Sequence, residues 1–339
     1  NKINTILHTN GKFDFDQAKK IVSLLPVNIA SFKDIKGKIN LKTNVNFFIN
    51  KKLKIKDLSY LTSGNISYLE FHTKENAIIK RYLPEYDPII ILKDSKVLST
   101  NDITKQNIEL SGLIKIKDNF SNYSIKENYN SKKSIFDING SIDLTDAKVI
   151  VSQLNYVKKS GKKSNLFFDI NFKLNEKYNI KSFSFKTDKD NINATNIELN
   201  KNFQLIDLKK IEVKTFLENK NNNNFLIENL KRIKVTGDIF DAQPLLKSLY
   251  KKNTRKNFSK NFNNDIKVNF NKTLTGTGDL ISDVSMIALI NKGSFEKLSL
   301  KGNFSKDEIL EISIYPTDKD KKNLYVMSDR AKPFVKNFN

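Results

Sequence analysis

The sequence contains no cysteine and no tryptophan, and only 2 histidines among its 339 residues. Without cysteine, neither a disulfide framework nor a thiolate metal site can form. His8 and His72 lie in unrelated contexts, and neither has a partner at the spacing of metal ligands. The sequence also lacks a nucleophile elbow, a phosphate-binding glycine loop and an HExxH motif. These absences predict a protein that is not an enzyme and that has no metal or other cofactor.

Arginine is scarce in a chain that is strongly basic. The formal charge is +22 at pH 7, from 59 Lys and Arg against 37 Asp and Glu, which invites a nucleic-acid-binding interpretation. Arginine occurs only at Arg81, Arg232, Arg255 and Arg330. The lysines are spread along the polar faces of expected strands and do not form one stripe with stacking aromatic residues. We therefore predict a solvated basic surface and no nucleic-acid partner.

No apolar run approaches the ~20 residues that a membrane-spanning helix needs. The longest apolar cluster, Ile89–Leu92, has only the length of a strand. The chain has no initial methionine and no signal peptide, and it starts and ends within its own pattern. We interpret it as part of a longer protein, whose anchor or export signal lies outside this chain.

What the sequence does have is alternation of apolar and polar residues. The longest example is Ile39–Ile49, and shorter runs lie at Phe136–Leu144, Leu166–Leu174, Ile266–Phe270 and Leu310–Ile314. A period of two places successive side chains on opposite faces of a sheet, so each run predicts a half-buried strand. One apolar and one polar face is typical of antiparallel sheet. We predict a mainly β fold, an antiparallel meander with one continuous apolar face.

Three short helices are expected to interrupt this sheet. The first begins at Asp14, an N-cap, with Gln17 at the capping-box position. The second covers 241–250 with Asp241 as N-cap, and the third covers 328–338 with a similar Asp-then-Pro pattern.

Loops are expected at 219–224, which is rich in Asn, and at the basic stretch 251–264. The basic stretch is either a solvated linker or a contact for anionic lipid headgroups. Residues 1–339 are expected to form one elongated β-rich region. A finer division would give a first sheet segment at 1–218 and a second at 225–339, beginning near the helix at 241–250.

Three segments resemble a known family. Gly140–Ala147, followed by Gln153–Gly161, resembles the G-x-L-D-L-T-D-A … L-x-W-x-K-x-x-G stretch of YhdP-type AsmA-like proteins. Gly237–Leu246 is similar to that family's G-x-x-x-D-A-R-P-L-L segment, and Leu324–Ala331 is similar to its L-x-x-x-S-D-D-A-G segment. The departures are Tyr156 for the usual Trp, Gln243 for Arg, and Arg330 for the second Asp.

This resemblance implies a long curved sheet, folded like a taco around an open groove. It also implies a location in the periplasm of a Gram-negative bacterium, with an inner-membrane anchor outside this chain. AsmA-like proteins are implicated in moving phospholipid towards the outer membrane and in maintaining its barrier. An apolar groove suits this role, because each acyl CH₂ removed from water contributes about 0.8 kcal/mol while the headgroup stays wet. The implied partners are phospholipid, the inner membrane and outer-membrane components.

The candidate groove residues are the apolar residues of the alternating runs. They are Ile39, Leu41, Val45, Phe47, Phe136, Ile138, Ile142, Phe168, Ile170, Phe172, Val268 and Phe270. The alternative for each is packing in a closed core against helices or a second sheet. A competing function is a periplasmic scaffold without lipid cargo. Such a scaffold would assist outer-membrane protein assembly through exposed sheet edges, as is implied for the distantly similar TamB-type proteins.

Overall fold

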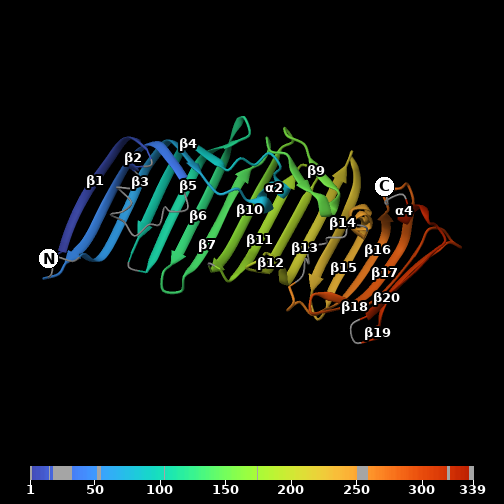
Figure 1. The fold of residues 1–339 in the computed structure, drawn as a ribbon. Helices are drawn as coiled ribbons and strands as arrows, with labels where there is room; N and C mark the ends of the chain where they lie inside the picture. Colours follow the sequence, from blue (N-terminus) through green and yellow to red (C-terminus); the bar gives the residue numbers. More distant parts are fainter. Residues whose placement is uncertain are drawn as a thin grey trace. The chain divides into compact units, whose positions relative to one another are not determined.

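The computed structural model describes residues 2–14, 16–17, 33–51, 55–102, 104–173, 175–249, 259–318 and 321–335. The protein is mainly β, as the alternation predicts, and 18 of its strands belong to one sheet (Figure 1). The chain forms two compact units. Unit 1 consists of Asn1–Ile150 and Lys158–Leu174, and unit 2 consists of Val151–Val157 and Asn175–Asn339. Residues 218–225, where the sequence places the finer division, lie inside unit 2.

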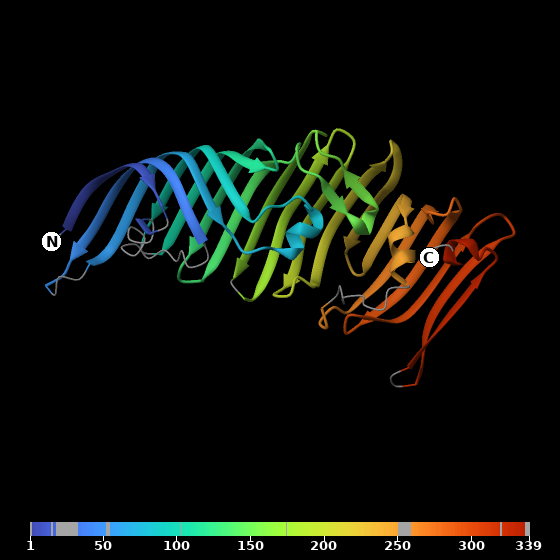
Figure 2. The same cartoon turned by 45° about the horizontal axis from the view of Figure 1, so that its top comes forward.

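Unit 1 is an antiparallel meander. Strands β1 to β7 each pair with the next along the chain, and β7 also pairs with β10. The strands are β1 Lys2–Phe13, β2 Lys33–Ile49, β3 Ile55–His72, β4 Ile89–Asn101, β5 Lys105–Ile116, β6 Asn119–Asn130, β7 Ile135–Asp143 and β10 Ser164–Lys173. The sheet of unit 1 is curved (Figure 2). Its first strand, β1, pairs only with β2 among the described strands, so the sheet does not close on itself.

Unit 2 is also built from strands that pair with the next along the chain, and all but one of these pairs are antiparallel. Its strands are β11 Lys177–Thr187, β12 Asn191–Asn200, β13 Leu205–Leu217, β14 Lys220–Asn229, β15 Ile233–Asp241, β16 Asn264–Leu274, β17 Leu280–Asn291, β18 Ser294–Asn303, β19 Ile309–Asp318 and β20 Lys321–Ser328. Strands β15 and β16 pair in parallel. The expectation of a purely antiparallel sheet is therefore wrong at this pair. The connection between them contains helix α3 (Gln243–Leu249), and a parallel pair needs such a crossover.

Two further elements interrupt the meander without a clear sequence signal. Strands β8 (Val149–Val151) and β9 (Tyr156–Lys158) form a separate two-stranded sheet around the 3₁₀ turn η1 (Ser152–Leu154). Helix α2 (Ala77–Tyr82) precedes β4, and the side chain of Asn76 caps it by accepting from the N–H of Ile78 at 2.9 Å. Helix α2 has only 6 residues and buries none of them, so it is shorter than the window in which helical periodicity is recognised.

The predicted capping box is confirmed. The N–H of Gln17 donates to Oδ1 of Asp14 at 3.0 Å, and the N–H of Asp14 donates to Oε1 of Gln17 at 3.3 Å. The rest of this predicted helix lies outside the described residues.

The other two predicted helices are displaced at their starts. Helix α3 begins at Gln243, whose N–H donates to Oδ1 of Asp241 at 3.1 Å, so Asp241 lies one residue before the N-cap position. Helix α4 begins at Lys332 and not at the predicted Ser328, which belongs to β20. Among the described residues the helix covers Lys332–Val335.

The predicted loop at 219–224 is wrong, because strand β14 begins at Lys220. The turn is shorter than predicted and consists of Glu218 and Asn219, with φ of 48° and 66°. Asn222 and Asn223 are buried. Their side-chain amides donate to the carbonyl of Leu154 at 3.2 and 2.7 Å, which offsets the cost of burying them.

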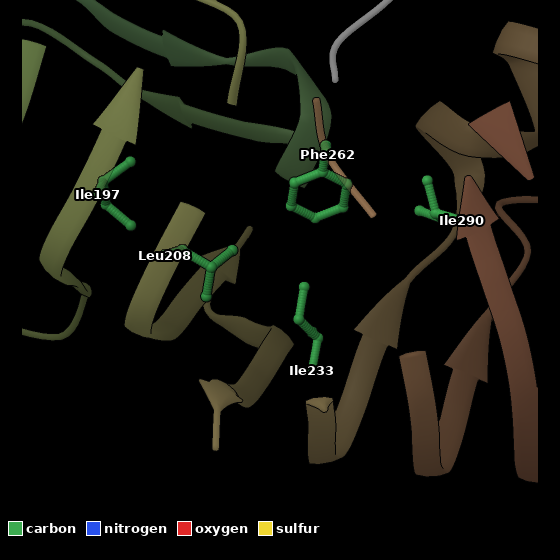
Figure 3. Packing of buried hydrophobic residues seen from close by; sticks show 5 residues of the cluster. All are labelled: Ile197, Leu208, Ile233, Phe262 and Ile290. Atoms are coloured by element: carbon green, nitrogen blue, oxygen red, sulfur yellow. The ribbon is translucent and has the colours of Figure 1, made fainter. Parts of the chain in front are cut away.

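Unit 2 has a packed core. One cluster consists of Ile197, Leu208, Ile233, Phe262 and Ile290, with the ring of Phe262 lying among side chains of the sheet (Figure 3). Phe262 comes from the segment that precedes β16 and is 1% exposed. The C-terminal end of the basic stretch at 251–264 is therefore packed into the core and is not a solvated linker. Residues 251–258 of this stretch lie outside the described part of the chain.

Candidate functional site

The strand register brings the ten candidate residues of unit 1 to one face of its sheet. Residues that pair directly across antiparallel strands point to the same side. From β1 to β10, three transverse rows follow from the pairings. The first row is Thr5, Val45, Tyr60, Asn101, Gln106, Tyr129, Phe136 and Phe172. The second row is Leu7, Thr43, Thr62, Ser99, Ile108, Glu127, Ile138 and Ile170. The third row is Thr9, Leu41, Gly64, Val97, Leu110, Ile125, Gly140 and Phe168.

A fourth row completes what we name the inner face of unit 1. Its members are Gly11, Ile39, Ile66, Ser95, Gly112, Tyr123, Ile142 and Leu166. Phe47 lies on the same side, paired with Ile3 beside the first row. The ten candidates of unit 1 therefore share one surface, although they come from β2, β7 and β10.

None of these ten candidates is fully buried. Each of them is half-buried, and in the four rows only Ile66, Ser95 and Tyr123 are buried. A closed core would leave less than about a tenth of such aliphatic and aromatic side chains exposed. The inner face of unit 1 is therefore less tightly packed than the core of unit 2.

Aromatic rings line one end of the inner face. The ring centroids of Tyr129 and Phe136 are 4.4 Å apart, and those of Phe136 and Phe172 are 5.2 Å apart, with both pairs stacked. In the same row, the side-chain amide of Gln106 donates to the hydroxyl of Tyr60 at 3.3 Å. These side chains give the first row an amphipathic character, as expected where an apolar surface meets water.

Two glycines of the inner face are required by close packing. A Cβ atom on Gly112 would lie 2.4 Å from Oγ of Ser95, and one on Gly140 would lie 3.0 Å from the ring of Phe168. Ser95 is also held in place by Tyr123, whose hydroxyl donates to its Oγ at 3.0 Å. Gly112 thus makes room for a side chain of the neighbouring strand, and Gly140 for both the ring of Phe168 and the backbone carbonyl of Ser124, 2.5 Å from the added Cβ.

The inner face is not continuously apolar, so that expectation is wrong. In β3 and β4 the rows carry Thr62, Ser99 and Asn101 in place of large apolar residues. The hydroxyls of Thr43 and Thr62 lie 2.9 Å apart and form a hydrogen bond. The inner face therefore carries most of its large apolar side chains on β5, β6, β7 and β10, and fewer on β3 and β4.

One charged residue lies in the four rows of the inner face, and sequence reasoning missed it. Glu127 on β6 pairs directly with Ile108 on β5 and with Ile138 on β7. Burial raises the pKa of its carboxyl group. The signal was present in the sequence, because Glu127 is in phase with Ile125 and Tyr129 in the alternating pattern.

The two candidates in unit 2 have different surroundings. Phe270 is buried, with its ring stacked 5.0 Å from that of Phe240 and edge-on to Phe225 at 5.8 Å. Val268 is half-buried and packs against the same cluster. At Phe270 the packing is that of a closed core.

The residues that carry the family resemblance lie in turns and hydrogen-bond networks. Lys158 is 1% exposed, and its ammonium group donates to the carbonyls of Leu144, Thr145 and Ala147 at 2.5, 2.8 and 2.7 Å. Burial lowers the pKa of Lys158 to about 8, against the opposing effect of Asp146 and other nearby carboxylates. The ammonium group therefore remains protonated at neutral pH and holds the 144–147 turn together.

A second network surrounds Tyr156, which stands where the family has Trp. Its hydroxyl donates to Oδ2 of Asp190 at 2.9 Å, and both residues are 1% exposed. Burial, and then the charge of Asp190, raises the pKa of Tyr156. The side chain of Asn155 donates to Oδ2 of Asp241 at 2.8 Å and to Oε1 of Gln243 at 3.0 Å. These motif positions fix the segment 151–157 within unit 2.

Among the residues with a described structure, no group of three or more His, Asp or Glu side chains could hold a metal ion. None of the helices in the described ranges has both the length and the apolar character needed to cross a membrane. Comparison of the chain with protein-family models, with curated proteins and with solved structures finds no match.

Proposed function

We propose that the inner face of unit 1 binds the acyl chains of phospholipids, and that the protein assists lipid transport between the inner and outer membranes. The observation that carries this proposal is the register of unit 1. It gathers ten apolar candidates on one face and leaves every one of them half-buried. An apolar surface that its own chain does not fully cover is stabilised by an apolar ligand.

The chemistry of the rows suits transport better than tight capture. On strands β5, β6, β7 and β10, the third and fourth rows contain only apolar, aromatic or glycine residues, with no charge. Each acyl CH₂ that contacts such a surface gains about 0.8 kcal/mol at most, and neighbouring strands offer similar contacts. A lipid can therefore move from strand to strand without breaking a specific interaction. The resemblance to AsmA-like proteins supports the same function, in the periplasm and with an anchor outside this chain.

A photo-crosslinking residue at Phe172 tests this proposal, with Asn171 as the matched control. The two positions are neighbours on β10, so they lie on opposite faces of one strand. In the longer protein expressed in cells, we expect phospholipid adducts at Phe172 and none at Asn171, identified by mass spectrometry. A folded protein with no adduct at either position would contradict lipid binding and favour the scaffold function.

A further inference from the structure

Glu127 is the one charged side chain in the four rows of the inner face. Its register partners are Ile108 and Ile138, and Ile125 and Tyr129 precede and follow it on the same face of β6. A carboxylate placed between isoleucines loses hydration and gains nothing from these neighbours. Burial raises the pKa of the Glu127 carboxyl group, as expected for a carboxylate among apolar side chains.

The nearest lysine in the sequence does not compensate this charge. Lys126 lies on the opposite face of β6, where its ammonium group forms an ion pair with Glu109 at 2.6 Å. The paired positions across from Glu127 on the neighbouring strands are uncharged. The site is thus an anionic group within an apolar surface, and a bound cation would compensate it.

The end of the strands near Glu127 carries charge of the opposite sign. The turn from β6 to β7 begins at Ser131, four residues after Glu127, and contains Lys132 and Lys133, both exposed. Lys105 begins β5 at the same end, paired with Asn130, and Asp102 beside it partly balances its charge, so the excess of positive charge comes from the two turn lysines. These lysines disfavour a purely cationic ligand and favour one that also has an anionic group.

We infer that unit 1 takes a lipid whose headgroup carries a positively charged amine beside its phosphate, with the amine bound by Glu127. This inference rests on the proposed function and specifies the ligand class. An ammonium group donates charge-assisted hydrogen bonds to a carboxylate, and these are strong where water is partly excluded. The acyl chains of the same molecule lie on the apolar rows, so one ligand satisfies both parts of the inner face.

Lipid loading from mixed vesicles tests this assignment. The full chain is incubated with vesicles of equal phosphatidylethanolamine and phosphatidylglycerol, reisolated, and its bound lipids are quantified by mass spectrometry. We expect the wild-type protein to be enriched in phosphatidylethanolamine. In the Glu127→Gln variant, the ratio of bound phosphatidylethanolamine to bound phosphatidylglycerol should fall about tenfold, because one charge-assisted hydrogen bond is removed. The total amount of bound lipid should stay the same. Glu127→Lys should reverse the preference.

The control is Glu109→Gln, which makes the same change on the opposite face of the neighbouring strand and should leave the lipid ratio unchanged. Equal lipid ratios in the wild-type protein and the Glu127→Gln variant would overturn the assignment of the amine to Glu127 and leave the proposed function standing. Absence of lipid from the wild-type protein would overturn both.

Discussion

Replacing Lys158 by methionine is expected to lower the free energy of unfolding by about 3 kcal/mol. Methionine keeps most of the length of the side chain but removes all three hydrogen bonds to the carbonyls of Leu144, Thr145 and Ala147. A buried acceptor that loses its partner costs about 1–3 kcal/mol, because water does not readily reach it. The loss should be measured by urea unfolding of the two proteins at neutral pH.

The neighbouring lysine provides the control. Lys159 is exposed, so Lys159→Met should change the free energy of unfolding by no more than about 0.5 kcal/mol. Equal stability of the two variants would contradict the role assigned to Lys158. It would mean that water or a rearranged 144–147 turn satisfies the three carbonyls.

The strands could be predicted from the sequence where one face meets water. The run Ile39–Ile49 lies within β2, and Leu166–Leu174 corresponds to β10 within two residues at each end. Alternation is a local property, so it identifies a strand without knowledge of its neighbours. It also placed Phe168, Ile170 and Phe172 on one face, because that follows from a period of two. Which strands lie beside them is set by turns and register, and these come from the structure.

The buried asparagines could not be predicted in this way. A run of Asn is typical of a loop, since the side chain competes for backbone hydrogen bonds. In β14 the side chain of Asn223 instead donates to Oγ1 of Thr215 at 2.9 Å, and its Oδ1 accepts from the N–H of Asp241 at 3.1 Å. These partners are 8 and 18 residues away in the sequence. Tertiary contacts therefore decide the structure of this segment, and local composition does not report them.

Alternation identifies which residues of β2, β7 and β10 share a face, but not how far the apolar part of that face extends. Continuity of the apolar face was inferred from runs on β2, β7 and β10, and the intervening strands bring Thr62 and Ser99 into the same rows. Period two reveals which residues of one strand share a face, but not what a neighbouring strand adds. Glu127 shows the same limit, since its significance comes from Ile108 and Ile138 on the adjacent strands.

The contrast between Ile170→Asp and Phe262→Asp should separate a ligand-binding face from a closed core. Ile170 is half-buried, so an aspartate there can reach water, and we expect it to lower the free energy of unfolding by only about 1–2 kcal/mol. Phe262 is 1% exposed within its cluster (Figure 3), and an aspartate there should cost about 5 kcal/mol or more. Chemical unfolding of both variants measures these losses.

Lipid adducts give the second measurement. With a photo-crosslinking residue at Phe172, Ile170→Asp should abolish the lipid adduct in a protein that remains folded, because it places a charge where acyl chains would lie. Phe167→Asp adds the same charge at an exposed position on the opposite face of β10 and should leave the adduct intact. If Ile170→Asp instead unfolds the protein as completely as Phe262→Asp, the inner face of unit 1 is a closed core. Its apolar rows would then stabilise the fold and would not be open to a lipid.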